Sequence, residues 1–359
     1  MAGIRPLEER DISQVAALHQ SVFEIPSTPD IHDRYRSYLR DKFLEPARQG
    51  GFPSLVFEDE NARIMGFVAV ATRKFVMGGQ VVRAAVSSQF VVHKDARSNL
   101  VAVALLRHFL RGPQDCSFTD EANAASQSLW EKMGGSAVPM YSMHWIALLR
   151  PASLLVGKAR ERIGRLAGLA APVANLMDAA AAKIPYRWRP RPQPGLQMEP
   201  LSTKALADFM REPLDDALLR PSYEVCCLDR LLNDASQKTW HGTLERIMLR
   251  ARDGKAAGWY LYYANRNGIG EVLQVGFRNE YKNEVIGHLF HHAASHGVAA
   301  LAGRLEPHFS HALADRCCLL SPRKYAMLVH SKDPHIVNVI QSGKAFISRL
   351  EGEWCLRFA

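Results

Sequence analysis

The chain has 359 residues, of which 47% are hydrophobic and 23% are charged. This composition is ordinary for a globular protein and excludes a largely disordered, collagen-like or disulfide-stapled chain. At this length we expect two domains, and no uncharged apolar run is long enough for a membrane-spanning helix. The first residues lack the basic end and apolar run of a secretory signal, so we expect a cytoplasmic protein.

The positive charge is concentrated in one segment. The net charge is +9, and residues 151–195 carry eight Lys and Arg against two acidic residues, so both flanking regions are nearly neutral. No basic and aromatic motif accompanies the charge, and we therefore do not expect nucleic-acid binding. Residues 154–183 are predicted to form a helix that braces two domains, followed by a stiff Pro-rich linker. Contact of 154–183 with a membrane surface is the alternative, because basic and apolar residues would lie on opposite sides.

In the first half, hydrophobic periodicity and turn residues predict strands and helices in a definite order. Asp11 is the expected N-cap of the first helix. The expected elements are a strand from Ile4, a helix at 12–23, strands at 54–57, 64–75 and 81–92, a helix at 100–110, a strand at 115–118, a helix at 122–133 and a final strand at 141–149.

The second half repeats this order. Met198-Glu-Pro-Leu201 echoes Ile4-Arg-Pro-Leu7, and Gly258 follows a turn as Gly66 does, at a nearly constant offset. Such self-similarity indicates an internal duplication. We therefore expect domains at 1–150 and 196–359 joined by a connector at 151–195, with 351–358 as the last strand of the second sheet.

The turn at 92–102 lies between the longest strand of the first half and the next helix. A helix start presents unpaired N–H groups and a positive dipole end, which suit a phosphate or pyrophosphate. The turn resembles the acyl-CoA loop of the GNAT superfamily, the Gcn5-related N-acetyltransferases, whose pattern is Val-x-Pro-x-x-Arg-x-x-Gly-x-Gly/Ala. Val92, Arg97 and Ala102 match this pattern, while Lys94 replaces Pro and Leu100 replaces the first Gly.

A later helix resembles the same family, whose pattern there is Asn-x-x-Ala-x-x-Leu-Tyr-x-x-x-Gly-Phe. Asn123, Leu129 and Gly134 keep the register, and Trp130 replaces the Tyr that often serves as general acid. The second half resembles the family more faintly, with Lys282 in the place of the loop Arg and a Gly kept five residues later.

The resemblance implies an α+β fold of two GNAT-like domains, each a mixed, mainly antiparallel sheet flanked by helices. It implies an acyl-CoA-dependent N-acyltransferase, with acetyl-CoA or another acyl-CoA as co-substrate and a small-molecule or protein amine as acceptor. The departures at Leu100 and Trp130 favour the alternative, a non-catalytic GNAT-fold binding or regulatory module without acyl-CoA activity.

The first half is the expected acyl-CoA site. The residues expected to bind the cofactor are Phe90, Val91, Val92, Arg97, Ser98, Asn99, Leu100, Val101, Ala102, Asn123 and Trp130. Candidates for the general base are His93, Asp120 and Glu121, which all follow strands at the same predicted sheet end. Ser87-Ser88-Gln89 could line a substrate groove.

We expect no metal site. His288, His292 and His296 share one helix face, but no Cys or carboxylate is spaced to complete a site, so a packed or solvated histidine face is the simpler interpretation. The six cysteines, with no Cys-x-x-Cys among them, are expected to be reduced and mostly buried.

Overall fold

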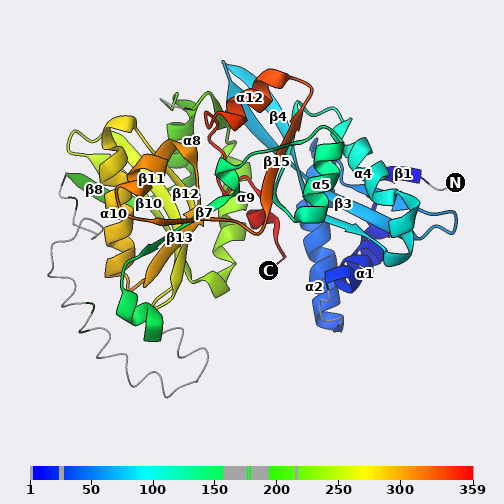
Figure 1. Cartoon of the computed structure of the whole chain (residues 1–359), viewed down its shortest axis with the longest axis horizontal. Coiled ribbons are helices and arrows are strands. Elements are labelled where there is room, and N and C mark those ends of the chain that lie inside the picture. The colour runs from blue at the N-terminus through cyan, green and yellow to red at the C-terminus, as the bar shows by residue number, and fades with distance from the viewer. Residues whose placement is uncertain are drawn as a thin grey trace. The chain divides into compact units, whose positions relative to one another are not determined.

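The structure is a computed structural model that describes residues 3–23, 28–156, 176, 178, 193, 195–214 and 217–358. The chain forms two compact units, each flanked by helices around its own sheet (Figure 1). The first unit consists of Met1–Pro139, Lys324–Ser342 and Glu351–Phe358, and the second of Met140–Arg323 and Gly343–Leu350. Neither unit is therefore one continuous stretch of sequence.

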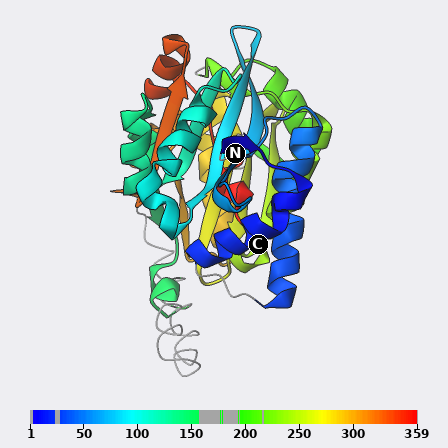
Figure 2. The ribbon, with the colours of Figure 1, turned by 90° about the vertical axis from the view of Figure 1, so that its right-hand side faces the viewer.

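The sheet of the first unit has the strand order β1-β2-β3-β4-β5-β15-β6. Neighbours in this order are antiparallel except β4 and β5. The long β3–β4 hairpin (light blue in Figure 2) turns at Gly78 and Gly79, which both have positive φ. The strands are β1 (Gly3–Pro6), β2 (Leu55–Glu58), β3 (Ile64–Met77), β4 (Gln80–Val92), β5 (Cys116–Ala122), β6 (Ser136–Ala137) and β15 (Ala326–Ser331). The helices are α1 (Ile12–Phe23), α2 (Pro29–Leu39), α3 (Glu45–Arg48), α4 (Val101–Leu110), α5 (Ala124–Lys132) and α12 (Pro334–Gln341).

The sheet of the second unit has the strand order β14-β7-β13-β12-β11-β10-β8. Here too one neighbouring pair, β12 with β13, is parallel and the others are antiparallel. The strands of this sheet are β7 (Met143–Leu148), β8 (Leu196–Pro200), β10 (Thr243–Ala251), β11 (Ala256–Ala264), β12 (Ile269–Phe277), β13 (Ala300–Arg304) and β14 (Leu319–Pro322). The second unit also contains the short strand β9 (Leu219–Pro221), which is not part of this sheet. The helices are α8 (Thr203–Arg211), α9 (Val225–Ser236), α10 (Lys282–Ser295) and α11 (Ser310–Ala314).

The two units share one packing device. A Cβ placed on Gly66 of β3 would lie 2.9 Å from Cγ1 of Val101, and a Cβ on Gly258 of β11 would lie 2.9 Å from Cγ2 of Val285. Each valine lies in the first turn of the helix that follows the long central strand. The glycines thus let α4 and α10 approach their sheets closely. This close approach gives a structural reason for the matching positions of Gly66 and Gly258 in the two halves of the sequence.

Two strand assignments from the sequence are wrong. The strand at 141–149 does not close the first sheet, because β7 pairs with β13 and β14 in the second unit. The first sheet is instead completed by β15, which pairs with β5 and β6. The predicted last strand at 351–358 is a 3-10 turn, Glu353–Leu356, in the first unit. Local apolar patterning indicates a buried segment, whereas its partner is set by long-range packing.

The predicted N-cap and the predicted burial of the cysteines differ from the structure, whereas the predicted histidine face agrees with it. Asp11 is not the N-cap of α1, because it ends the 3-10 turn Glu9–Asp11 and its carboxylate pairs with Arg5 at 2.6 Å. The cysteines are not mostly buried: only Cys116 and Cys355 are. The histidine face is packed, with Nδ1 of His292 2.8 Å from the Tyr262 hydroxyl.

Most of the predicted connector and linker lies outside the described residues. Residues 151–156 are helical, and Asp178 accepts hydrogen bonds from the backbone N–H groups of Ala152 and Ser153, each at 2.9 Å. In the part of the chain that the structure describes, no helix is both long and apolar enough to span a bilayer.

Candidate functional site

The candidate site of the first unit lies where two parallel strands separate. β4 and β5 pair over only three residues, from Ala84 with Cys116 to Val86 with Phe118. Beyond these pairs β4 contains a bulge, at which Gln89 takes a positive φ of 49° and the register with β3 shifts. A bulge bends its strand and re-aims side chains, so β4 leaves β5 and opens a gap in the sheet.

A pocket of about 330 Å³ occupies this gap. Ser87, Ser88, Gln89 and Phe90 of β4 form one wall, as the sequence suggested for the serines and Gln89. The opposite wall comes from β5 and α5, and from the later segments that contribute Tyr325, Glu353 and Arg357. The expected cofactor residues Phe90, Asn123 and Trp130 all line the pocket.

Two of these residues are also structural. Asn123 is the N-cap of α5, and its Oδ1 accepts a hydrogen bond from the Ser126 N–H at 2.9 Å. Trp130 is 1% exposed and meets the edge of the Phe109 ring at a centroid distance of 6.0 Å. The large indole that replaces the family's Tyr therefore closes the base of the pocket against the core.

The turn before α4 keeps the backbone conformation of a glycine. Leu100 has φ 57° and ψ 17°, in the left-handed region, and its side chain is 68% exposed. The Leu side chain at the family's Gly position is thus directed to solvent, and Leu100, the N-cap residue, makes no side-chain hydrogen bond to the start of α4. The 3-10 turn Lys94–Asn99 includes Arg97, Ser98 and Asn99, of which only the backbone is described. Val91 and Val101 are buried, at 2% and 1% exposed, and Val101 belongs to the core of the unit.

A carboxylate that the sequence analysis did not select lies beside the pocket. Oε1 of Glu353 accepts hydrogen bonds from the Thr119 hydroxyl and from the N–H groups of Asp120 and Glu121, the latter two at 3.1 Å. Burial, together with the negative charges of Asp120 and Glu121, raises the pKa of Glu353 to about 8. Glu353 was missed because its segment was predicted as a strand of the other sheet.

The three candidate bases from the sequence lie in different settings. Asp120 is 1% exposed, and its Oδ1 accepts the Glu353 N–H at 2.7 Å, so it holds the Glu353 backbone. Glu121 lines the pocket and forms a two-bond ion pair with Arg357, at 2.5 and 2.8 Å. His93 is not among the pocket-lining residues; its Nδ1 accepts the Asp95 N–H at 3.3 Å.

The second unit has the same strand divergence with different contents. β12 and β13 also pair over three residues, from Ile269 with Ala300 to Glu271 with Ala302. Beyond them the Arg349 N–H donates to the Leu273 carbonyl at 3.2 Å, and Nε2 of His308 donates to the Val275 carbonyl at 3.2 Å.

Side chains also occupy the gap between β12 and β13. Arg304, which is 1% exposed, donates to the Ile347 carbonyl at 2.6 Å, and Phe346 stacks on His308 with a centroid distance of 5.0 Å. The gap of the second unit is therefore filled by residues 343–350 and by side chains of β13 and the segment after it.

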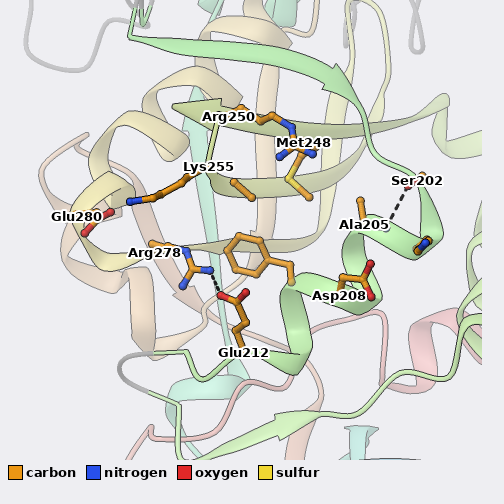
Figure 3. A pocket seen from close by; sticks show the side chains of 12 residues that line it. Ser202, Ala205, Asp208, Glu212, Met248, Arg250, Lys255, Arg278 and Glu280 are labelled. Carbon is orange, nitrogen blue, oxygen red and sulfur yellow. Dashed lines mark hydrogen bonds and ion pairs between the residues drawn. The ribbon is translucent and has the colours of Figure 1, made fainter. Parts of the chain in front are cut away.

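An open groove of the second unit is lined by a different set of the described residues. A groove of about 830 Å³ runs between α8 and the β10–β11 turn (Figure 3). Its walls carry charges of both signs, including Lys255 and Asp208, and an ion pair joins Arg278 to Glu212. Lys282, the counterpart of Arg97, is the first residue of α10, with its Nζ 5.6 Å from the centroid of the Phe277 ring.

Comparisons with known structures identify proteins of similar fold. A probable N-acyltransferase from Enterococcus faecalis V583 is 13% identical, with a TM-score of 0.59, and the match covers 92% of this chain and 72% of that one. A GCN5-related N-acetyltransferase from Anabaena variabilis is also 13% identical, with a TM-score of 0.59 and coverage of 93% and 74%. Eis1 from Mycobacterium abscessus is 12% identical, with a TM-score of 0.55 and coverage of 95% and 76%.

At these identities the likeness is one of fold, and no curated protein matches the sequence. The family model of the GNAT acetyltransferase domain matches residues 3–115, which contain β1 to α4 and the turn with Arg97. Residues 3–115 therefore match the model of the GNAT acetyltransferase domain, in a chain with the fold of GCN5-related N-acetyltransferases.

Proposed function

We propose that the protein is an N-acyltransferase that transfers an acyl group, in the simplest case acetyl, from acyl-CoA to an amine in the first-unit pocket. The observation that carries the proposal is the open gap between β4 and β5, in a unit whose α4 follows Leu100, a residue with no capping side chain. A helix start with free N–H groups suits a pyrophosphate, and an unpaired strand edge suits an extended amide-containing arm.

The residues present fit such a co-substrate. Leu100 keeps the left-handed backbone that the family's glycine provides, so the approach to the start of α4 is preserved. The amides of Val101 and Ala102 would hold phosphate oxygens, and Arg97 would add a positive charge. When bound, acyl-CoA supplies an acyl group activated as a thioester.

The chain's own groups would supply position and proton transfer. The β4 edge from Phe90 to Val92 would hold the acyl carbonyl through backbone N–H groups. Glu353, fixed by the three donors on its Oε1, would take the proton from the acceptor ammonium. Asp120 would position Glu353 through its backbone N–H, and Glu121 would orient Arg357 at the pocket wall.

His93 remains a second candidate base. It follows β4 directly, and its backbone N–H donates to the Met65 carbonyl at 2.8 Å, which fixes its place at the sheet end. Glu353 is the stronger candidate, because it lines the pocket and its raised pKa lies in the range that a base needs near neutral pH.

We propose that the second unit is a GNAT-like domain without an acyl-CoA site. The carbonyls of Leu273 and Val275 on its central strand already have partners, and Phe346 fills the space beside them. The chain would then be a tandem protein with one catalytic unit. The non-catalytic role would then belong to the second unit alone.

A binding and turnover experiment tests the proposal. Acetyl-CoA at ~100 times its Kd should stabilise the protein by ~2.7 kcal/mol in a thermal-shift assay. Labelled acetyl-CoA should then transfer its acetyl group to members of a panel of primary amines. Stabilisation without transfer to any amine would support a CoA-binding module, and the absence of stabilisation would refute the proposed site.

A further inference from the structure

The first turn of α9 brings two thiols and a carboxylate together at the surface. Glu224 is the N-cap residue of α9, and Cys226 and Cys227 lie in its first turn. The two Sγ atoms are 4.0 Å apart, and one ligand atom from each of the three residues lies within 4.8 Å of the others. Among the described residues, this is the one group of three His, Cys, Asp or Glu side chains that meets this distance.

Cys226 and Cys227 are not placed to form a disulfide with each other. Consecutive Cα atoms are about 3.8 Å apart across a trans peptide, whereas disulfides need about 4.4–6.8 Å. No cis peptide occurs in the described chain, and both cysteines lie inside a regular helical turn. Cys226 and Cys227 therefore remain a dithiol, and both are exposed to solvent.

The spacing of the sulfur atoms suits a soft cation. Zn–S bonds of about 2.3 Å at a tetrahedral angle place two sulfur ligands about 3.8 Å apart. The observed 4.0 Å is close to this value, so both thiolates could bind one ion with a small rotation. The Glu224 carboxylate adds an oxygen ligand within 4.8 Å of both sulfur atoms.

The surroundings hold this turn in place. The Tyr223 hydroxyl, just before the group, accepts a hydrogen bond from Nε2 of Gln274 at 2.8 Å. At the other end of α9 the Ala235 carbonyl accepts from the Tyr263 hydroxyl at 2.6 Å. A helix fixed at both ends orders the ligands before binding, which lowers the entropic cost of capturing an ion.

We propose that Glu224, Cys226 and Cys227 form a binding site for a thiophilic divalent cation of the zinc class, with water completing the coordination. The site differs from the histidine face of α10, whose members His288 and His292 hydrogen-bond to tyrosine hydroxyls through Nδ1. It is independent of the proposed acyl-transfer site, which lies in the first unit.

Zinc uptake by the full chain tests the site. The protein is incubated with zinc chloride under a phosphine reductant, desalted and analysed for metal by mass spectrometry. We expect about one zinc ion per chain, lost in the double variant Cys226→Ser/Cys227→Ser and weakened in Glu224→Gln. The matched control is Cys317→Ser/Cys318→Ser, a second adjacent pair that should leave the uptake unchanged. Equal uptake by the Cys226→Ser/Cys227→Ser variant would overturn the proposal.

A second readout uses the unaltered protein. Zinc should slow the alkylation of Cys226 and Cys227 by iodoacetamide, measured by peptide mass spectrometry, and should leave the rate at the exposed Cys317 unchanged. Equal slowing at Cys317, or no slowing at Cys226 and Cys227, would refute the site.

Discussion

The two units contain the same strand divergence, yet only that of the first unit remains open. In each, two parallel strands pair over three residues and then separate, beside a helix packed on a glycine of the neighbouring strand. The C-terminal part of the chain supplies residues to both gaps. Gly343–Leu350 belongs to the second unit, and Glu351–Phe358 to the first.

The difference lies in the side chains that this segment delivers. In the second unit it inserts Phe346 and donates the Arg349 N–H to the central strand, which removes the free strand edge. In the first unit it delivers Glu353 and Arg357, which line a pocket of about 330 Å³ and leave β4 accessible. We therefore expect the co-substrate to bind in the first unit, where β4 remains accessible, and not in the second.

Removing the proposed base should have the largest effect. Glu353→Gln should lower kcat by ~10²–10⁴-fold, because the amide cannot accept the ammonium proton. For the unaltered protein kcat should rise with pH through about 8, since the carboxyl must be ionised to act, and the variant should lack this rise. Glu280→Gln, in the groove of the second unit, is the control with unchanged rates. A Gln variant with an unchanged rate and pH profile would exclude Glu353 as the base.

Emptying the filled gap should cost stability without creating a site. Phe346 is 2% exposed, and Phe346→Ala should lower the free energy of unfolding by ~3–5 kcal/mol, measured by urea denaturation. The matched change in the open pocket is Phe23→Ala, where the ring is 52% exposed and the loss should stay within ~0.5 kcal/mol. Equal losses at the two positions would contradict the contrast between a filled and an open gap.

Charge reversal at Arg97 and at Lys282 should show which unit binds acetyl-CoA. Arg97→Glu should weaken acetyl-CoA binding by ~1.5–3 kcal/mol, because one charge-assisted hydrogen bond is lost and a repulsive charge is added. Lys282→Glu in the second unit should leave binding unchanged. Calorimetric titration measures both variants, and loss of binding in the Lys282 variant alone would assign the site to the second unit.

Gly66 and Gly258 should differ in how much stability is lost when each is substituted by Ala. At Gly258 an added Cβ would lie 2.5 Å from the Gly276 carbonyl oxygen, whereas at Gly66 its nearest neighbour is Cδ1 of Leu105 at 2.7 Å. A backbone oxygen cannot move aside as a side-chain methyl can. Gly258→Ala should therefore lower the free energy of unfolding by ~1–3 kcal/mol and Gly66→Ala by less, with denaturation midpoints as the measurement. A larger loss for Gly66→Ala would reverse this ranking.

Residues close in sequence specified much of the frame around the site. The predicted hairpin and the strand-to-helix turn appear as β3, β4 and the start of α4. Their signals are short-range: alternating apolar residues and paired glycines. Phe90, Asn123 and Trp130, which line the pocket, were selected from two motifs that each lie within a short stretch of sequence.

The tertiary structure decided which segments complete each sheet and each gap. β7 and β15 are both short apolar strands, and nothing in their own residues tells which sheet each will join. The role of Glu353 depends on amides of β5 more than two hundred positions earlier, as the separation of 233 residues from Asp120 shows. Hydrophobic burial has no preferred direction, so the apolar pattern of the sequence determined which segments are buried and whether they form strands or helices, but not which segments they contact. Those contacts were fixed only when backbone donors and side chains from distant parts of the sequence packed together in the folded chain.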